Sequence, residues 1–412
     1  MPIERSGPLK GVTVIELCHV MAGPTCGLML ADMGADVIKV EKLDGGDDTR
    51  RALPPDINGE PAAFMMMNRN KRGVVVDLKT DGGKRVLRRL LEKADVVTEN
   101  YRKGTMEKLG LDYAALRKVN PGLIMASISG FGRTGPYADR PGFDLVAQGM
   151  SGLMSITGES PERPPVKVGA PLCDITAGLL LAMGVLAAYT YRLKTGEGQV
   201  VDTSLLEAGI THTYWQSAIC FADGKPPLAM GSAHPLNAPY QAVRTKDGYI
   251  NIGAANVKTW GLFIEAFGLQ RLGADDRFKD NAGRMANREA LIAEIETAFA
   301  PFTSAELLDK LEQAGVPAGP IFNVQEMHAD PQVRARDMVP TVAHPVAGDV
   351  QTIGLPVKFS DTPGKVGAAA PTFGQHTREV LLEYGFDAAE IAQLAGEKAI
   401  HVGDAPTADA AD

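Results

Sequence analysis

The sequence predicts an α/β fold with a large, doubly wound parallel sheet of the Rossmann-like kind, because short β-branched runs alternate with helical stretches through the first half of the chain. Five runs have the length and apolar character of buried strands. They are Val12–Leu17, Val37–Glu41, Val74–Asp77, Val96–Glu99 and Leu123–Ile128. Helical patterns lie between them, near residues 24–33, 80–92 and 113–118. Because ligands bind at the carboxyl ends of the strands in such sheets, we expect the site in the loops that follow these runs.

A second domain is predicted in the later part of the chain. The 412 residues exceed one ordinary core, and 45% apolar with 22% charged residues is typical of a globular protein. Prolines cluster near residue 226, and a strand-like run at 248–252 precedes helical patterns near 257–267, 288–300 and 304–314. We therefore predict a smaller α/β domain over residues 226–330.

Charge and cysteine content narrow the classes of partner. The net charge of −8 argues against nucleic acid and anionic membranes as partners. The four cysteines show no metal-type spacing, and no secretory leader precedes Gly11, so we expect a reduced, cytoplasmic protein without a metal site. The uncharged run from Ile175 to Tyr191 is slightly short for a membrane span and contains two glycines and two threonines, so it predicts a buried core helix.

Asp174 is the strongest catalytic candidate. It follows the Gly/Pro loop at 168–172 and precedes the uncharged run, which Lys194–Gly196 ends with a basic residue and a helix-stopping glycine. An acid at this place lies in the first turn of a helix, where peptide dipoles favour negative charge and free N–H groups can hold an oxyanion. The alternative is an N-cap aspartate that satisfies the first turn and has no other role.

Residues 130–135 match the G-x-G-x-x-G pattern of dinucleotide sites. In such a site the third glycine lies in the opening turn of a helix, whereas Pro136 and Pro141 keep this chain irregular, so we reject a nicotinamide or flavin site. Two uses remain for Gly130, Gly132 and Gly135: their backbone N–H groups can serve as donors to an oxyanion, or the glycines only form a turn.

Two residues near these motifs have plain explanations. His19 follows a strand, and we expect it to be a hydrogen-bonding residue behind the site. Cys173 lies beside Asp174 but has no paired histidine, so we expect it to pack as a small apolar side chain.

Further short segments extend the pattern over nearly the whole chain. They are Gly11–Leu17, Cys18–Pro24, Gly34–Glu41, Asn68–Arg72, Val74–Lys79, Ala94–Tyr101, Ile128–Pro136, Lys194–Gln199, Pro239–Tyr240, Asp247–Gly248, Ala314–Pro320 and Gly374–Arg378. Together they resemble the class III CoA-transferases, the family of formyl-CoA transferase and carnitine CoA-transferase. The resemblance implies an open-ring protomer in an interlocked homodimer. It also implies a discontinuous large CoA-binding domain of residues 1–205 and 335–412, joined to the small domain by linkers at 206–225 and 331–334.

The resemblance implies an enzyme that moves CoA from an acyl-CoA thioester to a free carboxylic acid. Asp174 would attack the donor carbonyl to give a mixed anhydride, and CoA thiolate would return to give an aspartyl-CoA thioester. The CoA thioester is a substrate, and no permanently bound cofactor is implied. The resemblance places CoA contacts on a set of residues in the large domain: Val20, Ala22, Lys42, Val76, Lys79, Asn100 and Lys108. We add Gly130 and Gly132 to the predicted binding residues because glycine loops can offer backbone N–H groups.

Several positions depart from the formyl-CoA transferases. Those enzymes carry a glutamine in place of Met21, and a lysine and a tyrosine in place of Ser129 and Phe131. Their glycine-rich lid has no counterpart in Asn251–Asn256. We therefore expect a dicarboxylic or short-chain acyl-CoA such as succinyl-CoA as the donor, rather than a formyl or oxalyl group.

Two other functions stay open. An α-methylacyl-CoA racemase, from the same superfamily, needs a histidine and an aspartate that exchange the α-proton. Phe143 stands where racemases have this histidine, and phenylalanine cannot carry a proton. A non-catalytic acyl-CoA binder would need Asp174 to be only a helix cap.

Overall fold

The computed structural model describes residues 3–403, which form two compact units. The first unit takes in residues up to 152, residues 168–213 and residues from 331 onward; the second consists of 153–167 and 214–330. The predicted boundaries differ in three places, and one of them is the expected linker 331–334, which belongs to the first unit. Residues 153–167, expected in the large domain, belong to the second unit, where the Gly231 N–H donates to the Gly158 carbonyl (2.9 Å). The expected linker 206–225 is divided at residue 213, and residues 404–412 of the predicted large domain lie outside the described residues.

A seven-stranded sheet forms the centre of the first unit, in the order β14-β5-β2-β1-β6-β7-β8. Neighbouring strands are parallel except β14, which is antiparallel to β5 at the edge. The strands are β1 (Thr13–Leu17), β2 (Asp36–Glu41), β5 (Arg72–Val76), β6 (Val96–Glu99), β7 (Ile124–Ser129), β8 (Val200–Ser204) and β14 (Ile400–His401). The five strands expected from the sequence are confirmed, and so is the α/β class; β8 and β14 were not predicted.

The strand order reverses next to β1, and this reversal indicates where a ligand can bind. From β1 the chain proceeds to β2 and β5 on one side, and then returns through β6 to the other side of β1. In an open parallel sheet, the carboxyl ends of the strands at such a reversal leave a crevice for ligands. In this protein the crevice lies between the ends of β1 and β6.

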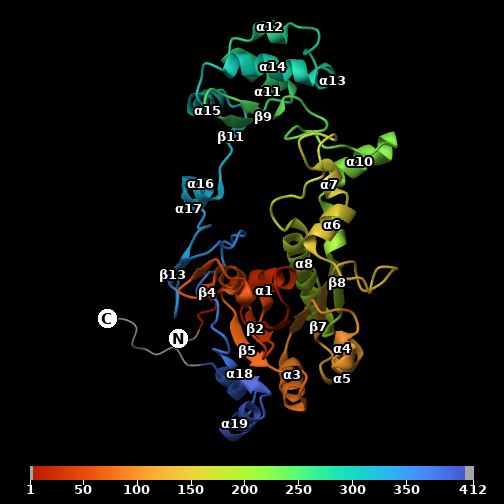
Figure 1. Ribbon diagram of the computed structural model, residues 1–412, viewed down its shortest axis with the longest axis vertical. Helices are drawn as coiled ribbons and strands as arrows, with labels where there is room; N and C mark the ends of the chain where they lie inside the picture. The colour runs from red at the N-terminus through yellow and green to blue at the C-terminus, as the bar shows by residue number, and fades with distance from the viewer. Residues whose placement is uncertain (1–2, 404–412) are drawn as a thin grey trace. The chain divides into compact units, whose positions relative to one another are not determined.

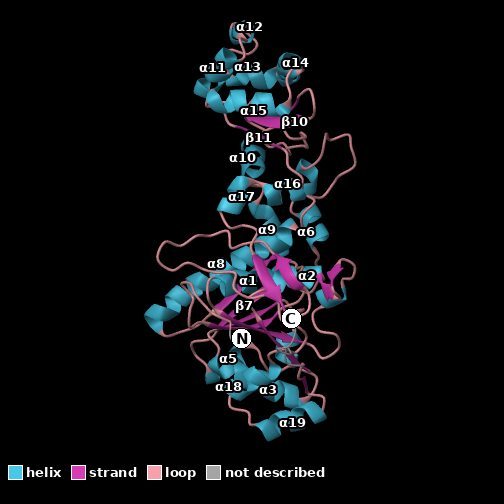
Figure 2. Cartoon of the chain, turned by 90° about the vertical axis from the view of Figure 1, so that its left-hand side faces the viewer, coloured by secondary structure: helices cyan, strands magenta, loops and turns pink. Residues whose placement is uncertain are grey.

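Helices cover both faces of this sheet (Figures 1 and 2). Helices α1 (Ala22–Asp32) and α8 (Leu172–Thr195) lie on one face, and α3 (Asp81–Lys93), α5 (Tyr113–Val119), α18 (Thr377–Glu383) and α19 (Ala388–Gly396) lie on the other. The second group packs on a core of aliphatic side chains from β1, β2, β5 and β6. The sheet is therefore doubly wound, as the alternating pattern predicts.

The first unit also contains shorter elements around the sheet. They are the 3-10 helix η1 (Asp48–Arg51), the hairpins β3 (Asp56–Ile57) with β4 (Glu60–Pro61) and β12 (Thr341–His344) with β13 (Gly348–Gln351), and the helices α2 (Ala62–Asn68), α4 (Thr105–Lys108), α6 (Asp144–Met150), α9 (Leu205–Thr211) and α17 (Pro331–Ala335).

Helix α8 was expected to be a buried core helix, but only one of its sides is buried. Its buried residues, such as Cys173, Ala177 and Leu181, lie on the side that packs on α1, β7 and β8. Met183 and Leu193, by contrast, are 62% and 72% exposed. Within residues 3–403, this is the one helix long and apolar enough to cross a membrane. The sequence could not distinguish these faces, because the helix is apolar all round and has no polar stripe to mark its outer side.

Four buried charges lie between the sheet and α1. The Glu16 carboxylate contacts the Nζ atoms of Lys39 (3.1 Å) and Lys71 (2.9 Å), and all three side chains are fully buried. Lys39 also contacts the Asp47 carboxylate (2.9 Å) and donates to the Cys18 carbonyl (2.9 Å). Two acids and two lysines balance in charge, which offsets the cost of burying them, and their contacts tie the end of β1 to the loop after β2.

The second unit has its own core. Strands β9 (Tyr240–Arg244), β10 (Tyr249–Gly253) and β11 (Ala318–Pro320) form an antiparallel sheet in the order β11-β10-β9. Its helices are α7 (Leu153–Ile156), α10 (Tyr214–Asp223), α11 (Val257–Ala266), α12 (Gln270–Gly273), α13 (Asn281–Ala286), α14 (Arg288–Phe299), α15 (Ser304–Gln313) and α16 (Val324–Ala329). The three long helices expected here match α11, α14 and α15 to within one residue, and they pack around buried aromatic rings such as Phe263 and Phe299.

We predict that Glu16→Gln strongly destabilises the protein. Both lysines lose a charged partner while they remain buried, which costs roughly 3–5 kcal/mol of the free energy of unfolding. Urea-induced unfolding measures the loss. The matched control is Glu197→Gln, which removes a half-exposed ion pair with Arg117 (3.0 Å) and should cost less than about 1 kcal/mol. Equal, small losses in the two variants would show that the buried cluster does not support the fold.

Candidate active site

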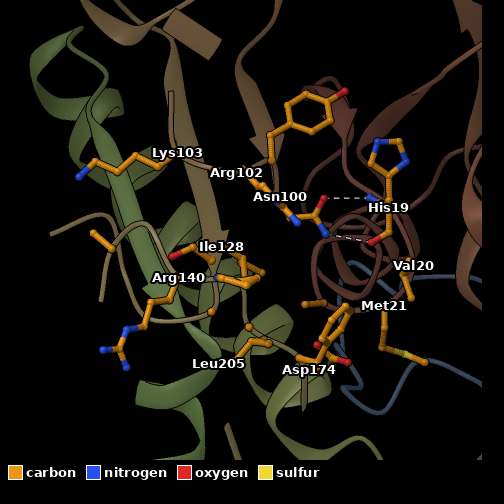
Figure 3. A pocket seen from close by; sticks show the side chains of 18 of the residues that line it. His19, Val20, Met21, Asn100, Arg102, Lys103, Ile128, Arg140, Asp174 and Leu205 are labelled. Atoms are coloured by element: carbon orange, nitrogen blue, oxygen red, sulfur yellow. Dashed lines mark hydrogen bonds between the residues drawn. The ribbon is translucent and has the colours of Figure 1, made fainter. Parts of the chain in front are cut away.

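A cavity of about 410 Å³ opens at the carboxyl ends of β1, β6 and β7 (Figure 3). His19, Asn100 and Gly130 follow these three strands directly or within two residues, and all three line it. Asp174, in the first turn of α8, lines the same cavity. The sheet and one helix N-terminus therefore bring residues that are far apart in the sequence to one place.

Asn100 joins the ends of β1 and β6. Its Oδ1 accepts from the His19 N–H (3.0 Å), and its Nδ2 donates to the His19 carbonyl (2.9 Å), as the dashed lines in Figure 3 show. A side-chain amide that pairs with both polar groups of one peptide fixes that segment as a sheet ladder would. Asn100 therefore shapes the cavity wall by holding the loop after β1.

Val20 lies in this loop with a strained backbone. Its φ of 67° falls in the left-handed region, which a β-branched residue rarely adopts and which costs roughly 1–3 kcal/mol. The Asp47 carboxylate compensates by accepting from the Val20 N–H at 3.2 and 3.3 Å. Burial by itself raises the pKa of Asp47, but Lys39 and the hydrogen bonds from Thr49 outweigh burial and hold that pKa well below its usual range. The buried ion pairs thus support a loop that forms the site.

Asp174 does not cap its own helix. The cap residue of α8 is Pro171, which makes no side-chain cap and has no N–H for Asp174 to bond in return. Instead, Asp144 from α6 accepts from the N–H groups of Cys173 (2.8 Å) and Asp174 (3.3 Å). No hydrogen bond or ion pair engages the Asp174 carboxylate within the described residues. The carboxylate that lines the cavity is therefore available for chemistry, and the N-cap explanation fails.

The surroundings of Asp174 alter its acidity. Burial, and then the neighbouring Asp144 carboxylate, raise the pKa of Asp174 to about 6. Burial, and then the same two acids, raise the pKa of the Cys173 thiol to about 12. The thiol stays protonated near neutral pH, whereas Asp174 ionises, so Asp174 is the better nucleophile of these two neighbours.

The glycines of the loop after β7 have different roles. Gly130 lines the cavity and lies so close to Gly142 that a Cβ on it would come within 2.7 Å of the Gly142 Cα. Gly132 has a φ of 89°, and its N–H donates to the Ser129 hydroxyl (2.9 Å). That N–H is therefore engaged, and turn formation explains Gly132.

Some of the predicted CoA contacts meet at the cavity and others do not. Val20, Ala22, Asn100 and Gly130 line it together with Asp174. The remaining predicted residues are not in its wall: Lys42, Val76, Lys79, Lys108 and Gly132. Lys42 pairs with Asp48, which does line the cavity, while Lys79 and Lys108 are exposed. The Val76 side chain is part of the core under α3, so any nucleotide contact there would involve its backbone.

Three cations of the cavity wall are not among the residues predicted from the sequence. Arg102, Lys103 and Arg140 line it, and Figure 3 shows Lys103 and Arg140 on the side away from His19. Arg102 and Lys103 directly follow Asn100, so their place after a strand was a usable signal. The position of Arg140 in an irregular loop gave no such signal. Within residues 3–403, no group of three histidine, cysteine or acidic side chains could hold a metal ion.

Comparison with known proteins identifies the family. Residues 9–377 match the model of CoA-transferase family III. The succinate–glutarate CoA-transferase of Agrobacterium fabrum is 41% identical, over 92% of this chain and 96% of the relative. The succinyl-CoA:mesaconate CoA-transferase of Haloarcula marismortui is 40% identical, over 92% and 97%. The crystal structure of a CAIB/BAIF family protein from Brucella suis has 41% identity and a TM-score of 0.82, covering 92% of this chain and 100% of that one.

We predict that the Asp174 carboxyl group titrates near pH 6. Because burial and a like charge disfavour ionisation, the protonated form should persist below that pH and the carboxylate should dominate above it. Infrared difference spectra of wild type against Asp174→Asn, recorded across the range, isolate this one carboxyl band. A midpoint near the ordinary aspartate value of about 3.9 would contradict the described environment.

Proposed function

The chain belongs to CoA-transferase family III and is a CoA-transferase, and we propose that it moves CoA from a dicarboxylic acyl-CoA to a free carboxylic acid through intermediates on Asp174. The observation that carries the proposal is the unbonded Asp174 carboxylate in the cavity wall, beside a helix end that Asp144 caps instead. Such a carboxylate can attack without first breaking a hydrogen bond.

The first half-reaction transfers CoA to the enzyme. An Asp174 oxygen attacks the donor thioester carbonyl, the carbon–sulfur bond breaks, and CoA leaves as the thiolate, so that a mixed anhydride of Asp174 and the donor acid remains. The thiolate then attacks the Asp174 carbonyl of the anhydride, which gives an aspartyl-CoA thioester and releases the donor acid with one oxygen from Asp174. The acceptor carboxylate then attacks the aspartyl-CoA thioester, and the same two steps run in reverse. Every bond that breaks is matched by a bond that forms, so no further cofactor is required.

Backbone donors are available for the oxyanions of these steps. Helix α1 begins at Ala22 with Met21 as its cap residue and no side-chain cap, and both residues line the cavity. The first N–H groups of a helix have no partner within it, so they favour a bound anion. We assign the oxyanion site to this helix end rather than to α8, because Asp144 already occupies the N–H groups of Cys173 and Asp174.

The relatives support a dicarboxylic donor. Both CoA-transferases described above carry succinate or succinyl-CoA in their names, paired with glutarate or mesaconate. Met21, in the place of the formyl-CoA transferase glutamine, presents an apolar side chain to the cavity. The cations Arg102, Lys103 and Arg140 supply positive charge for an anionic substrate. We infer that the acyl group has four or five carbons and a second carboxylate.

Racemase chemistry has no support at the position of the racemase histidine. Phe143 lines it at the position of the racemase histidine and is 75% exposed. It lies near Asp174 but can neither accept nor donate a proton. The α-hydrogen of the acyl group should therefore stay in place during turnover.

We propose that the partner in solution is a second copy of the chain. The outer side of α8 presents Leu179, Met183 and Leu193, which form an exposed apolar stripe on a helix whose other side packs on the sheet. Exposed apolar surface of this kind marks an interface. The interlocked homodimer of the family is the arrangement that we propose covers it.

Asp174→Ala should abolish transfer from succinyl-CoA to glutarate or mesaconate. Loss of the nucleophile should lower kcat by at least roughly 10,000-fold. Asp174→Glu should lower it roughly 100-fold, because the added methylene misplaces the attacking oxygen. Liquid chromatography with mass detection of the new acyl-CoA measures both.

A panel of acceptor acids and a stability measurement complete this test. Formate and oxalate should be poorer acceptors than the four- and five-carbon dicarboxylates. Each variant should keep the wild-type melting temperature to within a few degrees, since the Asp174 carboxylate has no hydrogen bond within the described residues. Near-normal turnover by a folded Asp174→Ala protein would end the proposal. Preference for formate would overturn the substrate class alone.

The dimer proposal predicts that subunits do not separate on dilution. Interlocked rings part only when the chain unfolds locally, so dissociation should follow denaturation rather than concentration. Sedimentation velocity of fluorescently labelled protein, at concentrations down to the nanomolar range, measures the mass. A folded monomer at low concentration would contradict the interlocked arrangement.

A further inference from the structure

Two polar residues of α6 hold the N-terminus of α8. The Asp144 Oδ1 accepts from the Cys173 N–H at 2.8 Å and from the Asp174 N–H at 3.3 Å. The cap therefore comes from a residue 30 positions earlier in the chain than Asp174, across a contact between two helices. A cap from a separate element fixes where the helix end lies relative to that element, and not only its local hydrogen bonds.

Gln148 extends this cap to the loop that precedes Asp174. Its side chain is fully buried, and its Nε2 donates to the Asp144 Oδ2 (2.7 Å) and the Ala170 carbonyl (3.3 Å). Its Oε1 accepts from the Val168 N–H (2.9 Å). Asp144 is thus held on both oxygens, and the loop and helix on either side of Pro171 are tied to one turn of α6.

We propose that Asp144 is a positioning residue for CoA transfer, which caps α8 so that the Asp174 carboxylate is left unbonded and fixed toward the acyl carbonyl. This inference rests on the proposed function of Asp174. Asp144 itself touches no reacting atom in the proposed steps. Its effect reaches the chemistry through the position and ionisation of Asp174.

The charge of Asp144 is the second part of this role. Burial is the largest cause of the raised pKa of Asp174, and Asp144 is the charged group that adds to it. The other titratable side chains that line the cavity are His19, Asp48, Tyr101, Arg102, Lys103, Asp139 and Arg140. Helices α9 and α1 also pack on α8. Helix α9 contains Glu207, which accepts from Ser204, and His212, which follows α9, forms a hydrogen bond with Thr176. Helix α1 contains Cys26 and Asp32.

Two substitutions separate the cap from the charge. Asp144→Asn keeps an oxygen that can accept from the Cys173 N–H, but it removes the negative charge and, because its Nδ2 is a donor, the hydrogen bond from the Gln148 Nε2. Asp144→Ala also removes the accepting oxygen, so the first-turn N–H groups of α8 lose their acceptor and Asp174 becomes the nearest acid that can satisfy them. The matched control is Asp387→Ala, which removes the cap of α19 (Glu390 N–H to Asp387, 2.8 Å) on the opposite face of the sheet.

The experiment measures kcat, KM for succinyl-CoA and the pH dependence of kcat/KM for each variant. For Asp144→Ala we expect kcat to fall roughly 100-fold, with KM changed less than about threefold, because the attacking oxygen is misplaced while CoA contacts persist. In wild type, activity should be lost as the pH falls through the raised pKa of Asp174, since only the carboxylate attacks. In Asp144→Asn one cause of that raised pKa is gone, so the acid limb should move to lower pH while kcat on the plateau falls less than roughly tenfold.

Hydroxylamine trapping keeps this proposal distinct from the proposed function. The nitrogen of hydroxylamine attacks the aspartyl-CoA thioester, releases CoA thiol and leaves a hydroxamate on Asp174 that peptide mass spectrometry detects. Absence of the adduct in wild type would overturn the nucleophile itself. An adduct that forms in Asp144→Ala at the wild-type rate, with an unshifted acid limb in Asp144→Asn, would overturn the positioning role. A kcat loss in Asp387→Ala as large as in Asp144→Ala would also overturn it, since general destabilisation would then explain both.

Discussion

The hydrogen bonds at the start of α8 are the constraint on which this site depends. A helix end leaves N–H groups without partners, and an aspartate three residues past the cap would ordinarily help to satisfy that end. In α15, α16 and α19 of this chain, a glutamate at that place does bond back to the cap residue. In α8 the cap is Pro171, which has no N–H, and Asp144 satisfies the first turn instead. These two features leave Asp174 free in the cavity wall.

The buried charges under α1 stabilise the part of the cavity wall that is formed by the loop after β1. Burying Glu16, Lys39, Lys71 and Asp47 costs solvation energy that apolar residues would not require. In return, Asp47 receives the Val20 N–H and stabilises a left-handed backbone that would otherwise be strained. The loop after β1 and the uncapped start of α1 are thereby held open toward the substrate.

The sequence predicted those features that local chemistry determines. Five strands were recognisable because each is a short, β-branched run buried on both faces, and Asp174 because a loop with glycine and proline leads into an apolar helix. Strand β8 was missed because exposed and half-buried residues alternate along it. Strand β14 was missed because it has only two residues. The exposed side of α8 and the cap from Asp144 depend on which elements meet in space, and no local pattern encodes such a contact. The lysines expected around CoA were placed by the family resemblance, and they are not in the cavity wall, whereas Arg102, Lys103 and Arg140 line it.

The central claim is that an oxygen of Asp174 is exchanged during every turnover, and heavy-oxygen labelling tests it most directly. The acceptor acid is supplied with heavy oxygen in its carboxylate, in ordinary water, and the peptide that contains Asp174 is weighed after turnover. If Asp174 forms the anhydride, collapse of the acceptor anhydride leaves one acceptor oxygen on its carboxylate, and later cycles pass that label to the released donor acid. Label on Asp174 and in the donor acid is the predicted result. Efficient transfer with an unlabelled Asp174 would contradict the account.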